Sequence, residues 1–113
     1  MFVPPEHIFP ELEATDRYGA IREILRRLIH IGALPSHSEE PLFAAFRRRE
    51  KVMSTGIGLG LAFPHVVSDL VTEQVLALGR SKNGVNFASL DGKQVKEIIL
   101  MISPNSKESA TSG

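Results

Sequence analysis

One stretch of the sequence, STGIGLGLAFPH at residues 54–65, gathers residue types that carry out chemistry. It begins with the hydroxyls of Ser54 and Thr55, continues through three glycines, and ends with His65 directly after Pro64. Proline fixes φ and removes a backbone donor, so an apolar strand here stops at Pro64 and His65 projects from a strand end. Strand ends are where ligands bind in α/β domains. His65 is therefore either a reactive histidine or a buried histidine that caps the strand.

Arg49 is a second candidate, five residues before Ser54. It follows Leu42 by seven residues, which places both on nearly the same helical face and Arg49 close to the core. A guanidinium in that position needs an anion or a carboxylate partner. The alternative is an arginine whose stem lies on the core and whose head lies in water. Glu50 is adjacent in sequence but projects elsewhere.

These residues together predict a cradle for an anion. The Arg49 cation, the hydroxyls of Ser54 and Thr55, and the backbone N–H groups of the three glycines would surround His65. The arrangement suits a phosphoryl group carried on an imidazole, and no carboxylate lies within the stretch to repel it. Phosphoryl transfer depends mainly on positioning and charge stabilisation, and it needs no Mg²⁺ when the donor is a phosphohistidine.

Nucleotide and metal sites are disfavoured. A dinucleotide fingerprint needs a third glycine where Leu61 stands, and the lysine-containing phosphate loop of P-loop proteins is absent. The chain has no cysteine, and its four histidines lack ligand spacing, so we expect no metal and no cofactor. His30 falls opposite the apolar face of its predicted helix and is expected at the surface.

The elements that position these residues begin with two helices. A short edge strand near residues 7–12 comes first, and Thr15 or Asp16 then caps a helix that Gly32 ends. The apolar residues of this helix share one face and three arginines point away; they are Ile21, Ile24, Leu25, Leu28 and Ile31, and Arg22, Arg26 and Arg27. A second helix begins with Ser38 as its cap, and its apolar stripe consists of Leu42, Phe43 and Phe46.

Two strands follow the glycine-rich stretch. One is predicted over residues 74–80 and the other over 97–102, with Asn-Gly and Asp-Gly turns at 83–84 and 91–92. The apolar residues of 97–102 do not alternate, so we expect this strand to be covered on both faces. This leaves three alternatives for the cover of the strand. Either the two helices lie on opposite faces of the sheet, or a partner protein covers one face, or the chain is a piece of a longer polypeptide.

Composition bounds the remaining possibilities. The chain has 113 residues, enough for one domain over residues 1–104, followed by a polar tail over 105–113 that we expect to be disordered. Its net charge of zero argues against nucleic acid as the main partner. No apolar run is long enough to span a bilayer, and the N-terminus does not resemble a signal peptide. We expect a soluble, cytoplasmic protein.

The segments RRREKVMSTGIGLGLAFPH and LGRSKNGVNFASLDGKQVKEIILMISP resemble the IIA domain of the phosphoenolpyruvate-dependent sugar phosphotransferase system, of the fructose/mannitol type. The nitrogen-regulatory IIA proteins belong to the same group. The resemblance extends from about residue 7 to residue 104. It implies an α/β sandwich in which a mixed β-sheet is flanked by helices. Compared with the family pattern, the fold of these residues is expected to lack the last helices.

The resemblance also implies a phosphotransferase component with no direct membrane insertion. His65 would accept a phosphoryl group at Nε2 from the phosphocarrier HPr, and would pass it to a cysteine of a IIB domain or hold it as a regulatory mark. Arg49 would steady the phosphoryl group. Thr55, with Ser54, would supply the hydroxyl side of the phosphoryl-binding pocket.

This chain departs from the family pattern in two ways. Val66 follows the histidine where the family has a small residue, and we expect it to narrow access for partners. The chain also stops before the family's second histidine and last helices, which would leave an apolar sheet face open to dimerisation or strand exchange. The alternatives are a non-catalytic regulatory module of the same fold that acts through protein contacts, or a fragment that survives as an oligomer.

Overall fold

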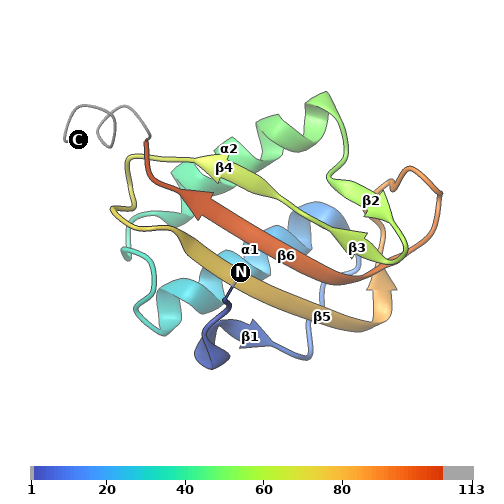
Figure 1. Ribbon diagram of the computed structural model, residues 1–113, viewed down its shortest axis with the longest axis horizontal. Helices are drawn as coiled ribbons and strands as arrows, with labels where there is room; N and C mark the ends of the chain where they lie inside the picture. Colours follow the sequence, from blue (N-terminus) through green and yellow to red (C-terminus); the bar gives the residue numbers. More distant parts are fainter. Residues whose placement is uncertain (1, 106–113) are drawn as a thin grey trace.

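A mixed six-stranded sheet with two helices forms the molecule (Figure 1). The computed structural model describes residues 2–105. The elements in chain order are η1 (Pro5–His7), β1 (Ile8–Phe9), α1 (Arg17–His30), α2 (Glu39–Val52), β2 (Gly56–Gly58), β3 (Leu61–Ala62), β4 (His65–Val67), β5 (Val75–Val85) and β6 (Val95–Ser103). The α/β class and the mixed sheet predicted from the sequence are confirmed.

Strand β6 organises the sheet. It pairs antiparallel with β5 on one side, and parallel with β3 and then β4 on the other. β1 adds to β5 as a parallel edge strand, within the predicted residues 7–12, and β2 pairs antiparallel with β3. The order is therefore β1-β5-β6-β3-β2, with β4 continuing along β6 beyond β3.

Both helices pack on the same face of the sheet, behind it in the view of Figure 1. Asp16 caps α1 as predicted, because its carboxylate accepts the N–H of Gly19 at 2.9 Å. The core between helices and sheet is apolar throughout; its fully buried members include Ala20, Ile21, Ile24, Leu25, Leu28, Phe46, Ile98, Leu100 and Ile102. The prediction for Ile31 is wrong: it lies just past the end of α1, off the regular helical face, and is 43% exposed.

The prediction that strand 97–102 is covered on both faces is also wrong. Ile98, Leu100 and Ile102 are buried under the helices, whereas Ile99 and Met101 between them are only half-buried. Since α1 and α2 share one face, neither helix covers the other face. We call it the open face; strand pairing places on it Ile8, Leu76, Leu78, Ile99 and Met101.

Two local predictions need correction. Ser38 precedes α2, but its side chain does not cap the helix; its hydroxyl donates to the carbonyl of Pro35 at 2.7 Å instead. Residues 83–84 do not end a strand, because β5 continues through them with a bulge between Arg80 and Val85, where Gly84 adopts φ +90°. The turn at 91–92 is confirmed, with the Asp91 carboxylate accepting the N–H of Lys93.

The predicted polar tail lies, from residue 106 onward, outside the described residues. Within residues 2–105, neither helix combines the length and the apolar character that crossing a membrane requires.

Candidate functional site

His65 is the first residue of β4, and its side chain is exposed on the open face, in register with Met101 of β6. The interpretation of His65 as a buried strand cap is therefore wrong. Its Nε2 lies 2.9 Å from the hydroxyl of Ser103, at the end of β6. The imidazole is accessible to solvent and has one side-chain partner in the described part of the chain.

The backbone directly before His65 is held from two sides. The carbonyl of Pro64 accepts the N–H of Met101 at 2.9 Å, which ties this segment to β6. The N–H of Phe63 donates to the carbonyl of Thr55 at 3.0 Å, which ties it to the segment before β2. The position of His65 therefore depends on both neighbours.

Ser54 and Thr55 lie beside this segment, but their polar groups already have partners. Thr55 is 4% exposed, and its hydroxyl donates to a carboxylate oxygen of Glu50 at 2.5 Å while its N–H donates to the other at 3.2 Å. The hydroxyl of Ser54 donates to the carbonyl of Phe87 and accepts the N–H of Gly56 at 2.9 Å. The predicted cradle of free donors is thus wrong for these groups.

Arg49 lies in the last turn of α2 and is exposed, so its predicted place close to the core is wrong. Its guanidinium donates to the carbonyl of Met53 at 2.6 Å, just past the helix end, where a cation is favoured by the helix dipole. Among residues 2–105 no carboxylate pairs with it, so its charge remains available to an anion. No hydrogen bond between described residues joins His65 to Arg49, Ser54 or Thr55.

Glu50 is the residue that sequence reasoning missed. It is 2% exposed, and it continues the four-residue spacing of Leu42 and Phe46 on the buried stripe of α2. That spacing was a signal in the sequence, because a carboxylate on a buried helical stripe needs donors nearby. It also places a carboxylate against the stretch that was expected to be free of acids.

Val66 does not narrow access to the imidazole, contrary to expectation. It pairs with Ile102 and is 9% exposed, as part of the core. Successive side chains of a strand point to opposite faces, so Val66 points toward the helices and His65 toward the open face.

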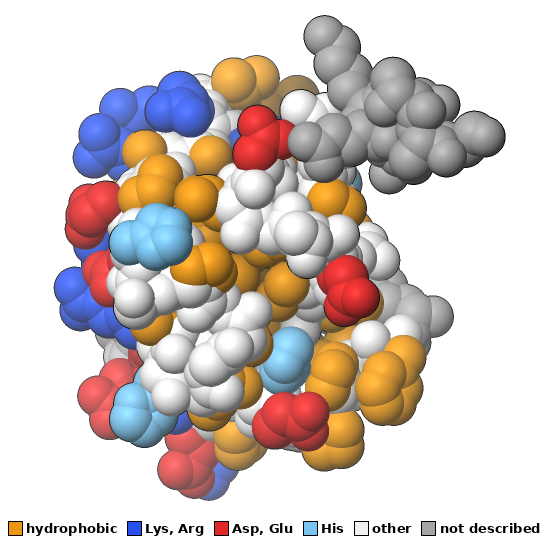
Figure 2. Space-filling model, turned by 90° about the vertical axis from the view of Figure 1, so that its left-hand side faces the viewer, with side chains coloured by type: hydrophobic (Ala, Val, Ile, Leu, Met, Phe, Trp, Pro, Cys, Tyr) orange, Lys and Arg blue, Asp and Glu red, His pale blue; other side chains and the backbone are white. Residues whose placement is uncertain are grey.

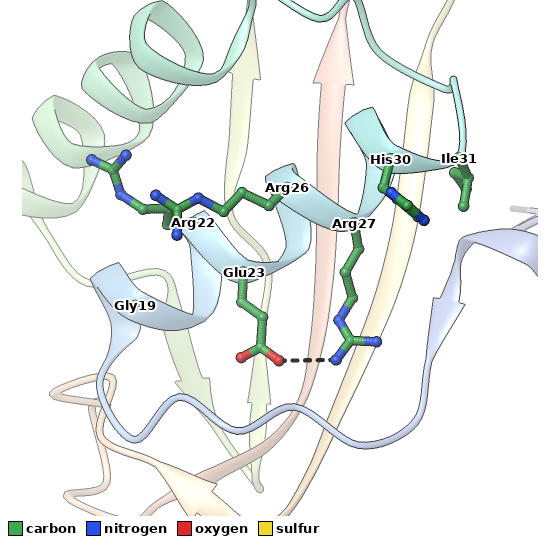
Figure 3. A pocket seen from close by; sticks show the side chains of 7 residues that line it. All are labelled: Gly19, Arg22, Glu23, Arg26, Arg27, His30 and Ile31. Carbon is green, nitrogen blue, oxygen red and sulfur yellow. Dashed lines mark hydrogen bonds and ion pairs between the residues drawn. The ribbon is translucent and has the colours of Figure 1, made fainter.

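A groove of about 460 Å³ on the outer surface of α1 is a competing candidate; it is lined by Gly19, Arg22, Glu23, Arg26, Arg27, His30 and Ile31 (Figure 3). Arg22 and Arg26 both donate to Glu39, at 2.8 and 2.9 Å, and Arg27 pairs with Glu23 at 3.4 Å. Hydrogen bonds from Arg26 and then Arg22 lower the pKa of Glu39. Acidic and basic side chains lie close together along one edge of the molecule (Figure 2). The arginines of this groove are paired with neighbouring carboxylates, so little positive charge is left there to bind an anion.

The family model described as "Phosphoenolpyruvate-dependent sugar phosphotransferase system, EIIA 2" matches residues 1–112. The chain belongs to this EIIA family. Its fold agrees with that membership, because the same mixed sheet and helices recur in solved IIA structures. The nitrogen regulatory protein IIA-Ntr of Neisseria meningitidis superposes with a TM-score of 0.80 at 27% identity, over 97% of this chain and 74% of that one. The IIA mannitol enzyme of Escherichia coli, solved in complex with its phosphorylated IIB, superposes at 0.74 with 23% identity, over 98% and 76%.

Curated relatives of this EIIA chain include transport and regulatory proteins. The fructose-specific EIIABC component of Bacillus subtilis is 36% identical over 80% of this chain and 14% of its own length. The fructose-specific EIIA component of Haloferax volcanii is 29% identical, over 89% and 64%. A nitrogen regulatory protein of Bradyrhizobium diazoefficiens is 28% identical, over 90% and 65%. The chain therefore spans less than two thirds of the length of each of these relatives.

Proposed function

We propose that this EIIA chain carries a phosphoryl group on His65, received from phospho-HPr and passed to a IIB cysteine or held as a regulatory mark. The observation that carries the proposal is an exposed imidazole whose preceding backbone is fixed on two sides, in a chain of this family. Nucleophilic attack on phosphorus depends on the placement of the attacking atom, and this arrangement supplies it.

The proposed transfer balances without a metal. The lone pair of His65 Nε2 attacks the phosphorus of the donor, the new N–P bond forms, and the donor's N–P bond breaks with its electron pair. The donor nitrogen takes up a proton, and the Nδ1 proton of His65 leaves to solvent. Arg49, which has no carboxylate partner among residues 2–105, would offset the charge of the phosphoryl oxygens.

Ser54 and Thr55 enter this proposal in two roles. Either their hydroxyls exchange the protein partners described above for phosphoryl oxygens, or they shape the segment beside His65 without touching the phosphoryl group. The buried hydrogen bonds of Thr55 to Glu50 favour the second role for Thr55.

The proposed partners are other proteins of the phosphotransferase system. The E. coli IIA mannitol enzyme forms a complex with phosphorylated IIB, which supports a IIB domain as the acceptor here. The similarity to nitrogen regulatory proteins favours a second candidate function, a non-catalytic module that acts by binding a regulatory target.

The test is the intact mass of the chain after incubation with phosphoenolpyruvate, enzyme I and HPr, with His65→Ala as the control. One added phosphoryl group that mild acid removes, and that is absent from the control, is the expected result. No added mass on folded protein would overturn the carrier proposal. Partner binding that His65→Ala leaves intact would then support the regulatory module.

A further inference from the structure

Glu50 is a buried carboxylate whose donors come from two other parts of the chain, α1 and the segment before β2. Its side chain is fully buried in the last turns of α2. It accepts the N–H and the hydroxyl of Thr55, and the guanidinium of Arg17 in α1 lies 3.5 Å away. A buried carboxylate destabilises the fold unless its oxygens accept hydrogen bonds. The bonds to Glu50 therefore join α1, α2 and the segment before β2.

Thr55 has no free polar group in this arrangement. Its N–H and hydroxyl both go to Glu50, and its carbonyl accepts the N–H of Phe63. Phe63 precedes His65 by two residues. An unbroken series of hydrogen bonds thus leads from α2 through Thr55 to the backbone that carries the imidazole.

The opposite side of that backbone is held differently. The carbonyl of Pro64 accepts the N–H of Met101 in β6, a bond that belongs to the sheet itself. The sheet therefore fixes one side of the segment before His65, and Glu50, acting through Thr55, fixes the other.

We propose that Glu50 is the positioning residue of the phosphoryl site: through Thr55 it holds the strand entry so that the His65 imidazole presents Nε2 to the donor. This inference rests on the proposed function of His65. Glu50 itself touches neither the imidazole nor, in this proposal, the phosphoryl group.

Two substitutions separate the links of this series. Glu50→Gln keeps the size of the side chain but removes its charge, and its amide can face the Thr55 hydroxyl only by reversing that bond, so that the hydroxyl accepts where it now donates. Thr55→Val keeps the shape and the backbone N–H but removes the hydroxyl, whereas Thr55→Ser keeps the hydroxyl. Glu40→Gln, at a side chain that is 75% exposed on the same helix, is the matched control.

The experiment uses phosphoramidate, a small donor with a P–N bond, so that protein docking does not enter. It measures the rate constant of His65 phosphorylation at saturating donor and the half-saturating donor concentration, on variants shown to be folded at the assay temperature. We expect the rate constant to fall at least tenfold in Glu50→Gln and in Thr55→Val, and no further in the double variant. Half-saturation should change less than twofold, and Thr55→Ser and Glu40→Gln should stay within about twofold of the wild type.

A folded Glu50→Gln protein that reacts at the wild-type rate, or a loss confined to half-saturation, would overturn the inference. Hydrogen exchange of the Phe63 amide and the ring signals of His65, followed by NMR in the unphosphorylated protein, supply a readout that needs no phosphorylation. Both should change in Glu50→Gln and not in Glu40→Gln. If the wild type takes up no phosphoryl group, the proposed function fails, while these NMR changes still decide whether Glu50 positions His65.

Discussion

The contact between His65 Nε2 and the Ser103 hydroxyl must open before that nitrogen can attack phosphorus. A hydrogen bond of this kind contributes about 0.5–1.5 kcal/mol, so its removal should favour the reactive state. Ser103→Ala is therefore expected to raise the rate of phosphorylation about two- to twelvefold. The measurement is the same single-turnover assay with phosphoramidate, and a rate below that of the wild type would show that the hydroxyl assists the transfer.

Asp91 links the loop before β6 to the tip of the β2–β3 hairpin. Its carboxylate accepts the N–H groups of Lys93 and Leu59, and these bonds lower its pKa below the ordinary 3.8. A carboxyl group with a lowered pKa stabilises the fold above its unfolded-state pKa, and this contribution is lost as the pH falls through the folded pKa. Asp91→Asn should therefore flatten the fall of the melting temperature below about pH 4. A curve between pH 6 and pH 2 that matches the wild type would contradict this.

At individual positions the sequence predicted which residues are candidates for the site better than it predicted the partners of their side chains. The proline before His65 was predicted to leave the imidazole at the end of a strand, whereas β3 ends at Ala62 and His65 begins a new strand, β4. The partners of Thr55 were not predictable in the same way, because they depend on where the end of α2 meets a segment five residues further on. Arg49 was misplaced because the prediction used only its seven-residue spacing from Leu42. The buried residues of α2 follow a four-residue spacing through Phe46 to Glu50, and this leaves Arg49 exposed.

The β2–β3 hairpin turns through three residues with positive φ, Gly58, Leu59 and Gly60. A leucine in the left-handed region is strained, and Leu59 is 92% exposed, so packing does not compensate. Leu59→Gly should stabilise the protein by about 0.5–1 kcal/mol, as measured by urea unfolding. Ile57→Gly in the same hairpin, at an exposed position without positive φ, is the control and should destabilise it.

Adjacent side chains of strand β6 point alternately to the face covered by the helices and to the open face. Leu100 is fully buried under the helices, and Ile99 is half-buried on the other side. Leu100→Ala should cost about 2–5 kcal/mol of unfolding free energy, whereas Ile99→Ala should cost about 1 kcal/mol. Equal losses in chemical denaturation would mean that the open face is covered in solution.

The helices and the order of the elements followed from periodicity, which is a local signal, and for α1 from its Asp16 cap as well. The length of β5 did not, because an Asn-Gly pair signals a turn and also fits a bulge, as Gly84 shows. Coverage of β6 was misjudged because an unbroken apolar run reveals hydrophobicity on both faces without revealing what lies there. Only the placement of both helices on one side decides that.

The molecule as a whole has a helical layer on one side of its sheet and the apolar open face on the other. Self-association through that face, predicted from the sequence, stays a prediction. Leu78→Lys, at a half-buried position in β5 whose pairing places it on the open face, should lower the sedimentation coefficient at high concentration if copies meet there. Glu97→Lys, on the same face, is a charge-changing control outside the apolar part. A wild type that sediments as a monomer at every concentration would dispose of this prediction.

The place of β6 in the sheet has a consequence for the growing chain on the ribosome. β1 and β5 meet β2, β3 and β4 only through β6, which follows all of them in the sequence. Until its nine residues leave the exit tunnel, no strand pairs with both halves of the sheet. A nascent polypeptide arrested before Val95 should therefore expose unpaired strands to proteases and chaperones, and acquire resistance in a single step when β6 emerges.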